Sequence, residues 1–274
     1  MSMSSEPAAP RTGGRRALIG STGFIGSQLR GQTQFDDVYH AADIHQIAGR
    51  RYALVVCAAP SAWKWRANQH PEQDRVHVDA LIGALRRIET DRFMLISTVD
   101  VYGRPAGVDE TTPVDPALAT PYGRHRFEVE QSVRECFRDH QIVRLGHPFG
   151  EGLKKGFLFD LLHDNRLDLT HCENVFQFYP AWRLWADLER VLSSRLPLVN
   201  IPTEPASARE VARDCFGIEF TNVTTQPPVR YDMRSVFGRE LGWDGHYRSR
   251  RTDVFRDIRD FAASARRVMG NPAR

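Results

Sequence analysis

Three glycines near the start of the chain have a spacing that suits pyrophosphate binding. Gly20, Gly23 and Gly26 lie in the stretch Ala17-Leu-Ile-Gly-Ser-Thr-Gly-Phe-Ile-Gly-Ser-Gln-Leu29. The first glycine permits a tight turn, the second leaves room for a phosphate, and the third lets a helix pack closely on a strand. The free N–H groups at the start of that helix favour anions. The stretch therefore predicts a dinucleotide site, with a Gly-rich turn that binds nothing as the alternative.

The stretch after the next expected strand bears on which dinucleotide binds. An acidic residue directly after that strand would hold the ribose hydroxyls of NAD. The chain reads Val38-Tyr-His-Ala-Ala-Asp43, so Asp43 comes late, and His40 could tolerate the 2′-phosphate of NADP. The choice between NAD and NADP stays open at this point.

Short apolar runs alternate with stretches of helical spacing through the first half of the chain. Continuous apolar strands indicate a sheet that is covered on both faces. Alternation of strands and helices indicates parallel strands joined by right-handed crossovers. We therefore predict an α/β fold with a Rossmann-type doubly wound parallel sheet. The expected strands are 16–20, 38–40, 52–57, 93–97 and 141–145, and the expected helices include 74–88 and 122–137.

The composition of the sequence changes after Pro148, where glycines and aromatic residues become frequent and the expected helices become shorter. This change predicts a smaller C-terminal substrate-binding lobe over the open end of the sheet. The expected organisation is a disordered tail over 1–14, a dinucleotide-binding domain over 15–147 completed by part of 184–202, and the second lobe mainly over 148–270.

The composition is that of an ordinary soluble globular protein, with 41% hydrophobic and 26% charged residues. No run approaches the ~20 apolar residues that a membrane span needs, and a net charge of +3 does not indicate nucleic-acid binding. Four cysteines without a CxxC spacing predict reduced thiols in a cytoplasmic protein and no metal site. Only three of the 37 basic residues are lysines, so a single arginine is weak evidence for a role.

Further segments join the glycine turn in a recognisable order. They are Val55-Val-Cys-Ala-Ala-Pro60, Leu95-Ile-Ser-Thr-Val-Asp-Val-Tyr-Gly103 and Tyr122-Gly-Arg-His-Arg126. From Arg15 to about Phe261, the chain resembles the extended short-chain dehydrogenase/reductase family, in its NAD-dependent nucleotide-sugar epimerase/dehydratase branch. The resemblance implies NAD or NADP as cofactor and a nucleotide-linked sugar, or a similar polyol, as substrate.

The resemblance also implies roles for a catalytic set. Thr98 would hydrogen-bond the reacting hydroxyl or carbonyl, and Tyr122 would be the acid/base. A phenol with a pKa of ~10 is a poor base unless a fixed positive charge lowers its pKa. The family's lysine four residues after the tyrosine is Arg126 here, which keeps the charge but does not release a proton. A working site and a degenerate, non-catalytic site both stay open.

Asp100 lies two residues before Tyr102, where dehydratase and decarboxylase relatives have a glutamate. A carboxylate beside a transiently oxidised sugar is a reasonable general base, and a loop cap is the alternative. Asp100 favours dehydration or epimerisation through a keto intermediate over plain reduction. An NADPH-dependent ketoreductase and a non-catalytic dinucleotide sensor are the competing interpretations.

The remaining expectations concern cofactor contacts, substrate contacts and assembly. Expected cofactor residues are Gly20, Thr22, Gly23, Phe24, Ile25, Gly26, Ala58, Ala59, Pro60, Tyr122 and Arg126. Candidate substrate residues are Lys64, Trp65, Asn68, His147 and Lys154. The resemblance further implies a homodimer through the helices 74–88 and 122–137, with Leu81, Leu85, Phe127, Val129 and Val133 as apolar candidates.

Overall fold

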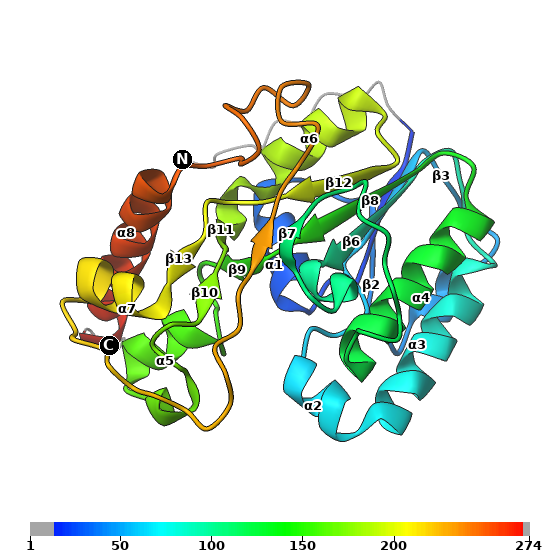
Figure 1. Ribbon diagram of the computed structural model, residues 1–274. Helices are drawn as coiled ribbons and strands as arrows, with labels where there is room; N and C mark the ends of the chain where they lie inside the picture. Colours follow the sequence, from blue (N-terminus) through cyan, green and yellow to red (C-terminus); the bar gives the residue numbers. More distant parts are fainter. Residues whose placement is uncertain (1–13, 271–274) are drawn as a thin grey trace, which may run out of the picture.

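A computed structural model describes residues 14–270, and a six-stranded parallel sheet forms the centre of the larger lobe (Figure 1). The expected tail therefore lies, except for Gly14, outside the described residues. The confirmed fold class is α/β with a Rossmann-like sheet of strand order β12-β8-β6-β4-β1-β2. Its strands are β1 (Arg16–Ile19), β2 (Asp37–Tyr39), β4 (Leu54–Cys57), β6 (Phe93–Thr98), β8 (His140–Leu145) and β12 (Leu198–Ile201).

Helices cover both faces of this sheet (Figure 1). Helices α3 (Pro71–Leu85) and α4 (Pro121–Cys136) lie on one face, and α1 (Phe24–Gln32) and α6 (Leu184–Ser194) on the other. Every residue of β4 is buried, with Val55 in the cluster beneath α3 and α4 and Val56 in the cluster on the opposite face. Burial on both faces is why the strands read as continuous apolar runs.

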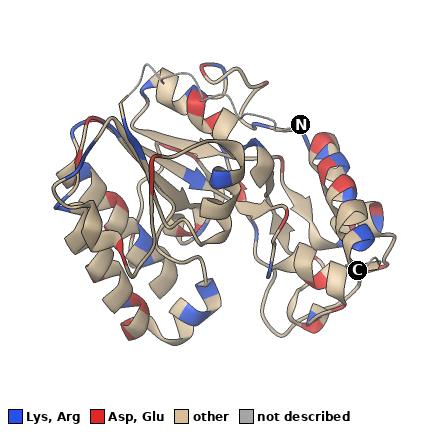
Figure 2. Ribbon diagram, turned by 180° about the vertical axis from the view of Figure 1, so that it is seen from behind, with Lys and Arg blue, Asp and Glu red and all other residues tan. Residues whose placement is uncertain are grey.

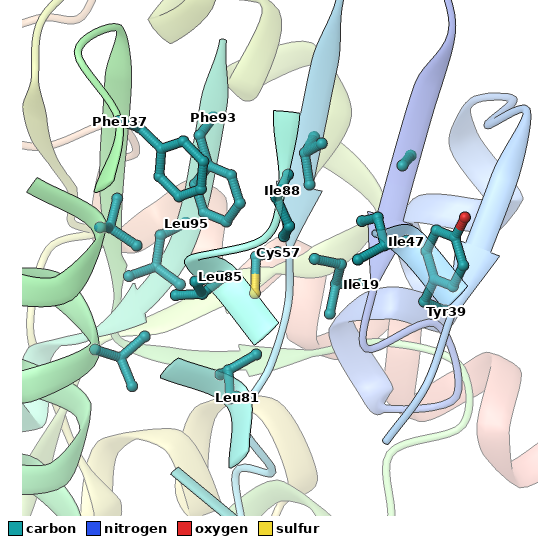
Figure 3. Close-up of a cluster of buried hydrophobic side chains, with 14 of the residues drawn as sticks. Ile19, Tyr39, Ile47, Cys57, Leu81, Leu85, Ile88, Phe93, Leu95 and Phe137 are labelled. Carbon is teal, nitrogen blue, oxygen red and sulfur yellow. The ribbon is translucent and has the colours of Figure 1, made fainter. Parts of the chain in front are cut away.

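The cluster beneath α3 and α4 uses residues that the sequence suggested for a dimer contact (Figure 3). Leu81 and Leu85 of α3 point toward the sheet, as Figure 3 shows, and Val129 and Val133 of α4 are buried in the same cluster. Their apolar surface is satisfied within one chain. These four residues therefore give no support to the predicted homodimer.

Element boundaries differ from the expected ones by a few residues. Helix α3 begins at Pro71 rather than at 74, because proline fits the first helical position, where its missing N–H is not needed. The expected strand 52–57 is two pieces, β3 (Arg51–Tyr52), which pairs with β5 (Glu89–Thr90), and β4. In the stretch 184–202, β12 pairs in parallel with β8 and forms the sixth strand.

The second lobe is built from short elements around its own hydrophobic cluster. Its helices are α5 (Phe157–His163), α7 (Ala208–Val211) and α8 (Arg251–Gly270), where acidic and basic residues are interspersed (Figure 2). Its two-stranded pairings are β9 (His147–Phe149) with β11 (Phe178–Pro180), and β10 (Val175–Phe176) with β13 (Ala206–Ser207). The short helices of the chain are α2 (Lys64–Gln69), η1 (Ile44–Ile47), η2 (Val99–Tyr102), η3 (Leu167–Leu169), η4 (Ala181–Arg183) and η5 (Ala212–Phe216).

Two features of this topology place a site. The chain runs from β1 outward to β2 and then returns past β1 to β4, so the strand order reverses between β1 and β4. Ligands of open α/β sheets bind at the carboxyl ends of the strands beside such a reversal. In addition, β14 (Asp232–Met233) of the second lobe pairs with β7 (Ala106–Val108), which follows β6. This pairing ties the second lobe to the same edge of the sheet. Within residues 14–270, no helix combines the length and the hydropathy of a membrane span.

Candidate active site

The glycine turn between β1 and α1 has the shape that a pyrophosphate site needs. Gly20 has a φ of +84°, and a Cβ there would lie 2.8 Å from the Ala58 carbonyl carbon. A Cβ at Gly26 would lie 2.1 Å from the Gly20 oxygen, so the helix could not pack as it does. These two glycines are required by the fold itself.

Gly23 is different, because the protein leaves space around it. A Cβ at Gly23 would meet only the Gly20 oxygen, at 3.4 Å, and the backbone there is extended with a φ of −71°. Helix α1 has no side-chain N-cap and no acidic residue in its first turn. Its first N–H groups therefore face an open, anion-favouring position, which fits the pyrophosphate of a dinucleotide.

Asp43 lies in the turn after β2 rather than at the end of the strand. Its Oδ1 accepts a hydrogen bond of 2.6 Å from the His40 N–H, and its Oδ2 lies 3.3 Å from His40 Nε2. The carboxylate is thus engaged in closing its own turn. This geometry leaves the choice between NAD and NADP where the sequence left it.

Thr98 and Asp100 stand at the carboxyl end of β6, near the reversal of strand order. Thr98 ends the strand, and its Oγ1 accepts a hydrogen bond of 3.2 Å from the Asp100 N–H at the start of η2. The Thr98 hydroxyl also donates to Asp100 Oδ2 at 3.3 Å. Thr98 therefore caps η2 and at the same time fixes the Asp100 carboxylate.

Helix α4 brings Tyr122 against this same turn. Thr120 caps the helix, and the Tyr122 N–H donates to Asn68 Oδ1 at 3.0 Å. A Cβ at Gly123 would lie 2.2 Å from the backbone carbonyl oxygen of Asp100, so glycine is needed for this close approach. Asn68, expected as a substrate residue, thus has its amide oxygen on the α4 backbone. The Tyr122 hydroxyl has no hydrogen-bond partner within residues 14–270.

Arg126 contacts the ring of Tyr122 rather than its hydroxyl. Its Cζ lies 4.2 Å from the ring centroid, and its guanidinium donates to Asp74 of α3 and to the Ser61 oxygen. Burial raises the pKa of Tyr122, while Arg126 partly offsets that increase. Arg126 Nε is buried without a partner among the described residues, which leaves one donor for a ligand.

Lys64, Asp100 and Tyr231 form a hydrogen-bonded triangle beside Thr98. Lys64 Nζ lies 2.6 Å from Asp100 Oδ1 and 2.8 Å from the Tyr231 hydroxyl, which donates to the same Oδ1 at 2.9 Å. Burial alone would raise the pKa of Asp100, but Lys64 outweighs it and the pKa lies below its usual range. The structure thus brings together two sequence candidates and a third residue, Tyr231, that sequence reasoning missed.

His147 lies against Tyr231 in an aromatic surround. Its ring centroid is 4.5 Å from that of Tyr231 at an interplanar angle of 90°, and Phe176 is 5.0 Å away. Burial lowers the pKa of His147 to about 4, so the imidazole is neutral at pH 7. Its Nδ1 is buried without a partner among the described residues, so His147 keeps one polar atom for a ligand.

The remaining candidates are Trp65, in the first turn of α2, and Lys154, in the loop after β9. Trp65 is 55% exposed and packs edge-on against Trp63, so it is available at the surface of the helix. Lys154 is exposed, whereas Lys155 donates to the Ala62 oxygen. Lys155, and not the predicted Lys154, therefore contacts the loop between β4 and α2.

The model of the "NAD dependent epimerase/dehydratase family" matches residues 32–167. Over these residues, just under half of the chain, the sequence is similar to this family. A search of curated proteins found no match. Because the family is NAD-dependent and the turn around Gly23 fits a pyrophosphate, the cofactor is NAD or NADP.

Solved structures share the fold at low sequence identity. UDP-glucose 4-epimerase from Thermotoga maritima has a TM-score of 0.69 at 15% identity, covering 93% of this chain and 99% of that one. A dTDP-glucose 4,6-dehydratase from Streptomyces venezuelae, with NAD bound, has a TM-score of 0.70 at 18% identity, covering 93% and 98%. A dTDP-4-dehydrorhamnose reductase from Bacillus anthracis, with NADP, has a TM-score of 0.70 at 16% identity, covering 92% and 99%. At these identities the structures show that the fold is shared over nearly the whole of each chain.

Proposed function

We propose that the protein is an NAD(P)-dependent enzyme that converts a nucleotide-linked sugar, or a similar polyol, through a transient keto intermediate. The observation that carries the proposal is Asp100, whose carboxylate accepts a hydrogen bond from Thr98 and whose backbone carbonyl packs against the helix start that bears Tyr122. Simple hydride transfer needs one proton-handling group, and a carboxylate beside it supplies a second. The neighbours named above act on nucleotide sugars as epimerase, dehydratase and reductase, which supports this substrate class.

Each part of the site has a task in this proposal. A bound nicotinamide supplies hydride acceptance and return. The turn from Gly20 to Gly26 holds the pyrophosphate. Thr98 orients the reacting hydroxyl, and Tyr122 takes its proton at the free phenol oxygen and later returns it. Asp100 takes a proton from the carbon next to the keto group, which the carbonyl makes acidic.

The experiment is mass spectrometry of the cofactor that copurifies with the protein, followed by incubation with UDP-glucose, dTDP-glucose and UDP-glucuronic acid. We expect bound NAD(H) or NADP(H) and conversion of a nucleotide sugar without net consumption of cofactor. Stoichiometric release of oxidised cofactor would instead identify a ketoreductase.

A non-catalytic dinucleotide sensor is the second candidate, and Arg126 is the observation that favours it. Its guanidinium is engaged by Asp74 and Ser61 and lies over the ring of Tyr122, away from a direct contact with the hydroxyl. A sensor would bind the cofactor and leave all three nucleotide sugars unchanged.

A further inference from the structure

Each pair among Lys64, Asp100 and Tyr231 is joined by a hydrogen bond. The Nζ–Oδ1, Nζ–Oη and Oη–Oδ1 distances are 2.6, 2.8 and 2.9 Å. A proton can therefore pass between the carboxylate and the phenol without a solvent molecule in between. Lys64 alone suffices to neutralise the buried Asp100 carboxylate, so Tyr231 is not needed for that purpose.

The three residues come from three distant parts of the chain. Lys64 is the first residue of α2, Asp100 is the second residue of η2, and Tyr231 precedes β14 in the second lobe. Tyr231 is 7% exposed and is fixed by its N–H bond to the Val175 oxygen at 3.1 Å and by the edge-on ring of His147. The phenol is thus held rigidly at the edge of the sheet where the site lies.

The phenol and the ammonium form a tyrosine–lysine contact that Tyr122 lacks. Lys64 Nζ is hydrogen-bonded to the Tyr231 oxygen, whereas the cation nearest Tyr122 lies over the ring face. An ammonium in contact with a phenol oxygen stabilises the phenolate that forms when the phenol gives up its proton. Burial and Asp100 raise the pKa of Tyr231, so the phenol keeps its proton until it is used.

We propose that Tyr231, held on Lys64 and Asp100, is a second acid/base phenol that protonates a leaving hydroxyl, so that the reaction includes loss of water. This inference rests on the proposed function and narrows it from the epimerase/dehydratase class to elimination. The substrate is then a nucleotide sugar with a hydroxyl on the carbon beta to the keto group.

Asp100 and Tyr231 together account for every proton that moves in this step. Asp100 takes the proton from the carbon alpha to the keto group, and the electron pair of that C–H bond forms the new C=C bond. As the C–O bond at the beta carbon breaks, the leaving oxygen takes the phenolic proton of Tyr231 and departs as water. The proton on Asp100 then crosses to the Tyr231 phenolate, which Lys64 has stabilised, and both groups are restored. No external oxidant or reductant is consumed by the elimination.

Every charged or titratable group that faces the triangle is consistent with this assignment. From β9, His147 is neutral at pH 7 because burial lowers its pKa to about 4, so it adds no competing charge. From α4, Tyr122 is neutral in the resting state and Arg126 is held by Asp74. The Lys64–Asp100 ion pair therefore sets the local electrostatics.

The test compares Tyr231→Phe with Tyr247→Phe as a matched control. Tyr247 lies in the same lobe and also donates to an aspartate, Asp232, at 2.5 Å, but it does not contact Asp100. The probes are UDP-glucose, dTDP-glucose and UDP-glucuronic acid, added to the protein loaded with the cofactor that copurifies with it, NAD or NADP. The readouts are product mass, absorbance of reduced nicotinamide, sugar-nucleotide affinity and melting temperature.

We expect Tyr231→Phe to slow water loss by about 100-fold or more, the usual size of an acid/base contribution. Oxidation still runs in the variant, so reduced nicotinamide accumulates, which a merely structural role of Tyr231 would not cause. Tyr247→Phe is expected to keep the rate, and both variants to keep sugar-nucleotide affinity.

Two outcomes would overturn the inference while the proposed function stands. They are water loss at the wild-type rate in Tyr231→Phe, and a wild type that inverts a sugar centre without losing water. A wild type that binds NAD(H) but neither reduces it nor changes any of the three probes overturns the proposed function, and the inference with it.

Discussion

Two tyrosines in this site are each paired with a cation, but through different parts of the ring. The Tyr122 ring face lies under the Arg126 guanidinium, 4.2 Å from its Cζ, and its hydroxyl is free of protein partners in residues 14–270. The Tyr231 hydroxyl lies 2.8 Å from Lys64 Nζ. A planar guanidinium stacks on aromatic faces, whereas a compact ammonium bonds an oxygen.

The difference separates the tasks of the two phenols. Tyr122 has an open hydroxyl next to the expected cofactor, so it suits a proton taken from the substrate during oxidation. The Tyr231 hydroxyl already donates a hydrogen bond to Asp100, so after giving up its proton it can take one back from that carboxylate. The comparison therefore assigns each phenol to one of two proton transfers, and the following substitutions test that assignment.

The largest effect is expected from Gly23→Val, because without a bound cofactor neither Tyr122 nor Tyr231 can act. The branched side chain occupies the space that the protein leaves open, so we expect dinucleotide binding to be abolished while the fold survives. Calorimetric titration with NAD and NADP measures this. Gly31→Val in the same helix, where a Cβ meets nothing within 4 Å, is the control and should bind normally. Unchanged affinity of Gly23→Val would refute the cofactor site.

Tyr122→Phe is expected to remove turnover and to leave cofactor affinity almost intact, because only the proton-transferring oxygen is lost. The oxidation itself fails, so reduced nicotinamide does not accumulate, in contrast to Tyr231→Phe. Single-turnover absorbance distinguishes the two variants. If Tyr122→Phe turns over a verified substrate like the wild type, the division of tasks is wrong.

Asp100→Asn should slow turnover by about 10²–10⁴-fold and leave NAD(P) affinity near that of the wild type. The amide cannot take a proton from carbon, and it leaves the Lys64 ammonium without its countercharge. Melting temperature reports the second effect separately. Full activity in a folded variant would make Asp100 a structural residue of η2.

A part of the site could be predicted from the sequence where its residues lie close together in the chain. The glycine turn lies within seven residues between a strand and a helix, so its spacing was enough to predict it. Thr98 and Asp100 are also adjacent, and the ordered motifs identified them. The same local logic predicted strands within a residue or two, since both-face burial leaves a continuous apolar run.

Tyr231 could not be predicted in this way. It is separated from Asp100 by 131 residues and from Lys64 by 167. The family-like segment near the end of the chain begins at Asp232, one residue after Tyr231, and the pairing of β14 with β7 brings Tyr231 to the site. The contact of Lys155 with the Ala62 oxygen was equally hidden, because sequence cannot tell which of two adjacent lysines turns inward.

His147 provides a test of stability rather than rate. Its pKa falls from 6.5 to about 4 on burial, so the unfolded chain binds this proton first as pH drops. Stability contributed by the neutral ring is therefore present above pH 6.5 and is lost as pH falls toward 4, by about 2 kcal/mol at pH 5. We expect His147→Asn to flatten the pH dependence of chemical denaturation between pH 7 and 5. The same substitution at exposed His77 is the control, and an unchanged slope in His147→Asn would contradict the burial argument.

The smallest effect is expected from Arg126→Lys, which replaces the ring-face cation by the residue that the family has. A lysine gives up the two-point contact with Asp74 and Ser61, but its ammonium can approach the Tyr122 oxygen as Lys64 approaches that of Tyr231. A lower pKa of the phenol then moves the pH optimum of turnover to lower pH, since more of the base form is present there, at about 1.36 kcal/mol per unit. We expect activity to be retained with this shift, measured as a pH–rate profile beside that of the wild type. In a degenerate site neither protein turns over any substrate. If Arg126→Lys is active and its profile coincides with that of the wild type, the cation at position 126 does not act on the Tyr122 hydroxyl, and the contrast between the two tyrosines loses its electrostatic basis.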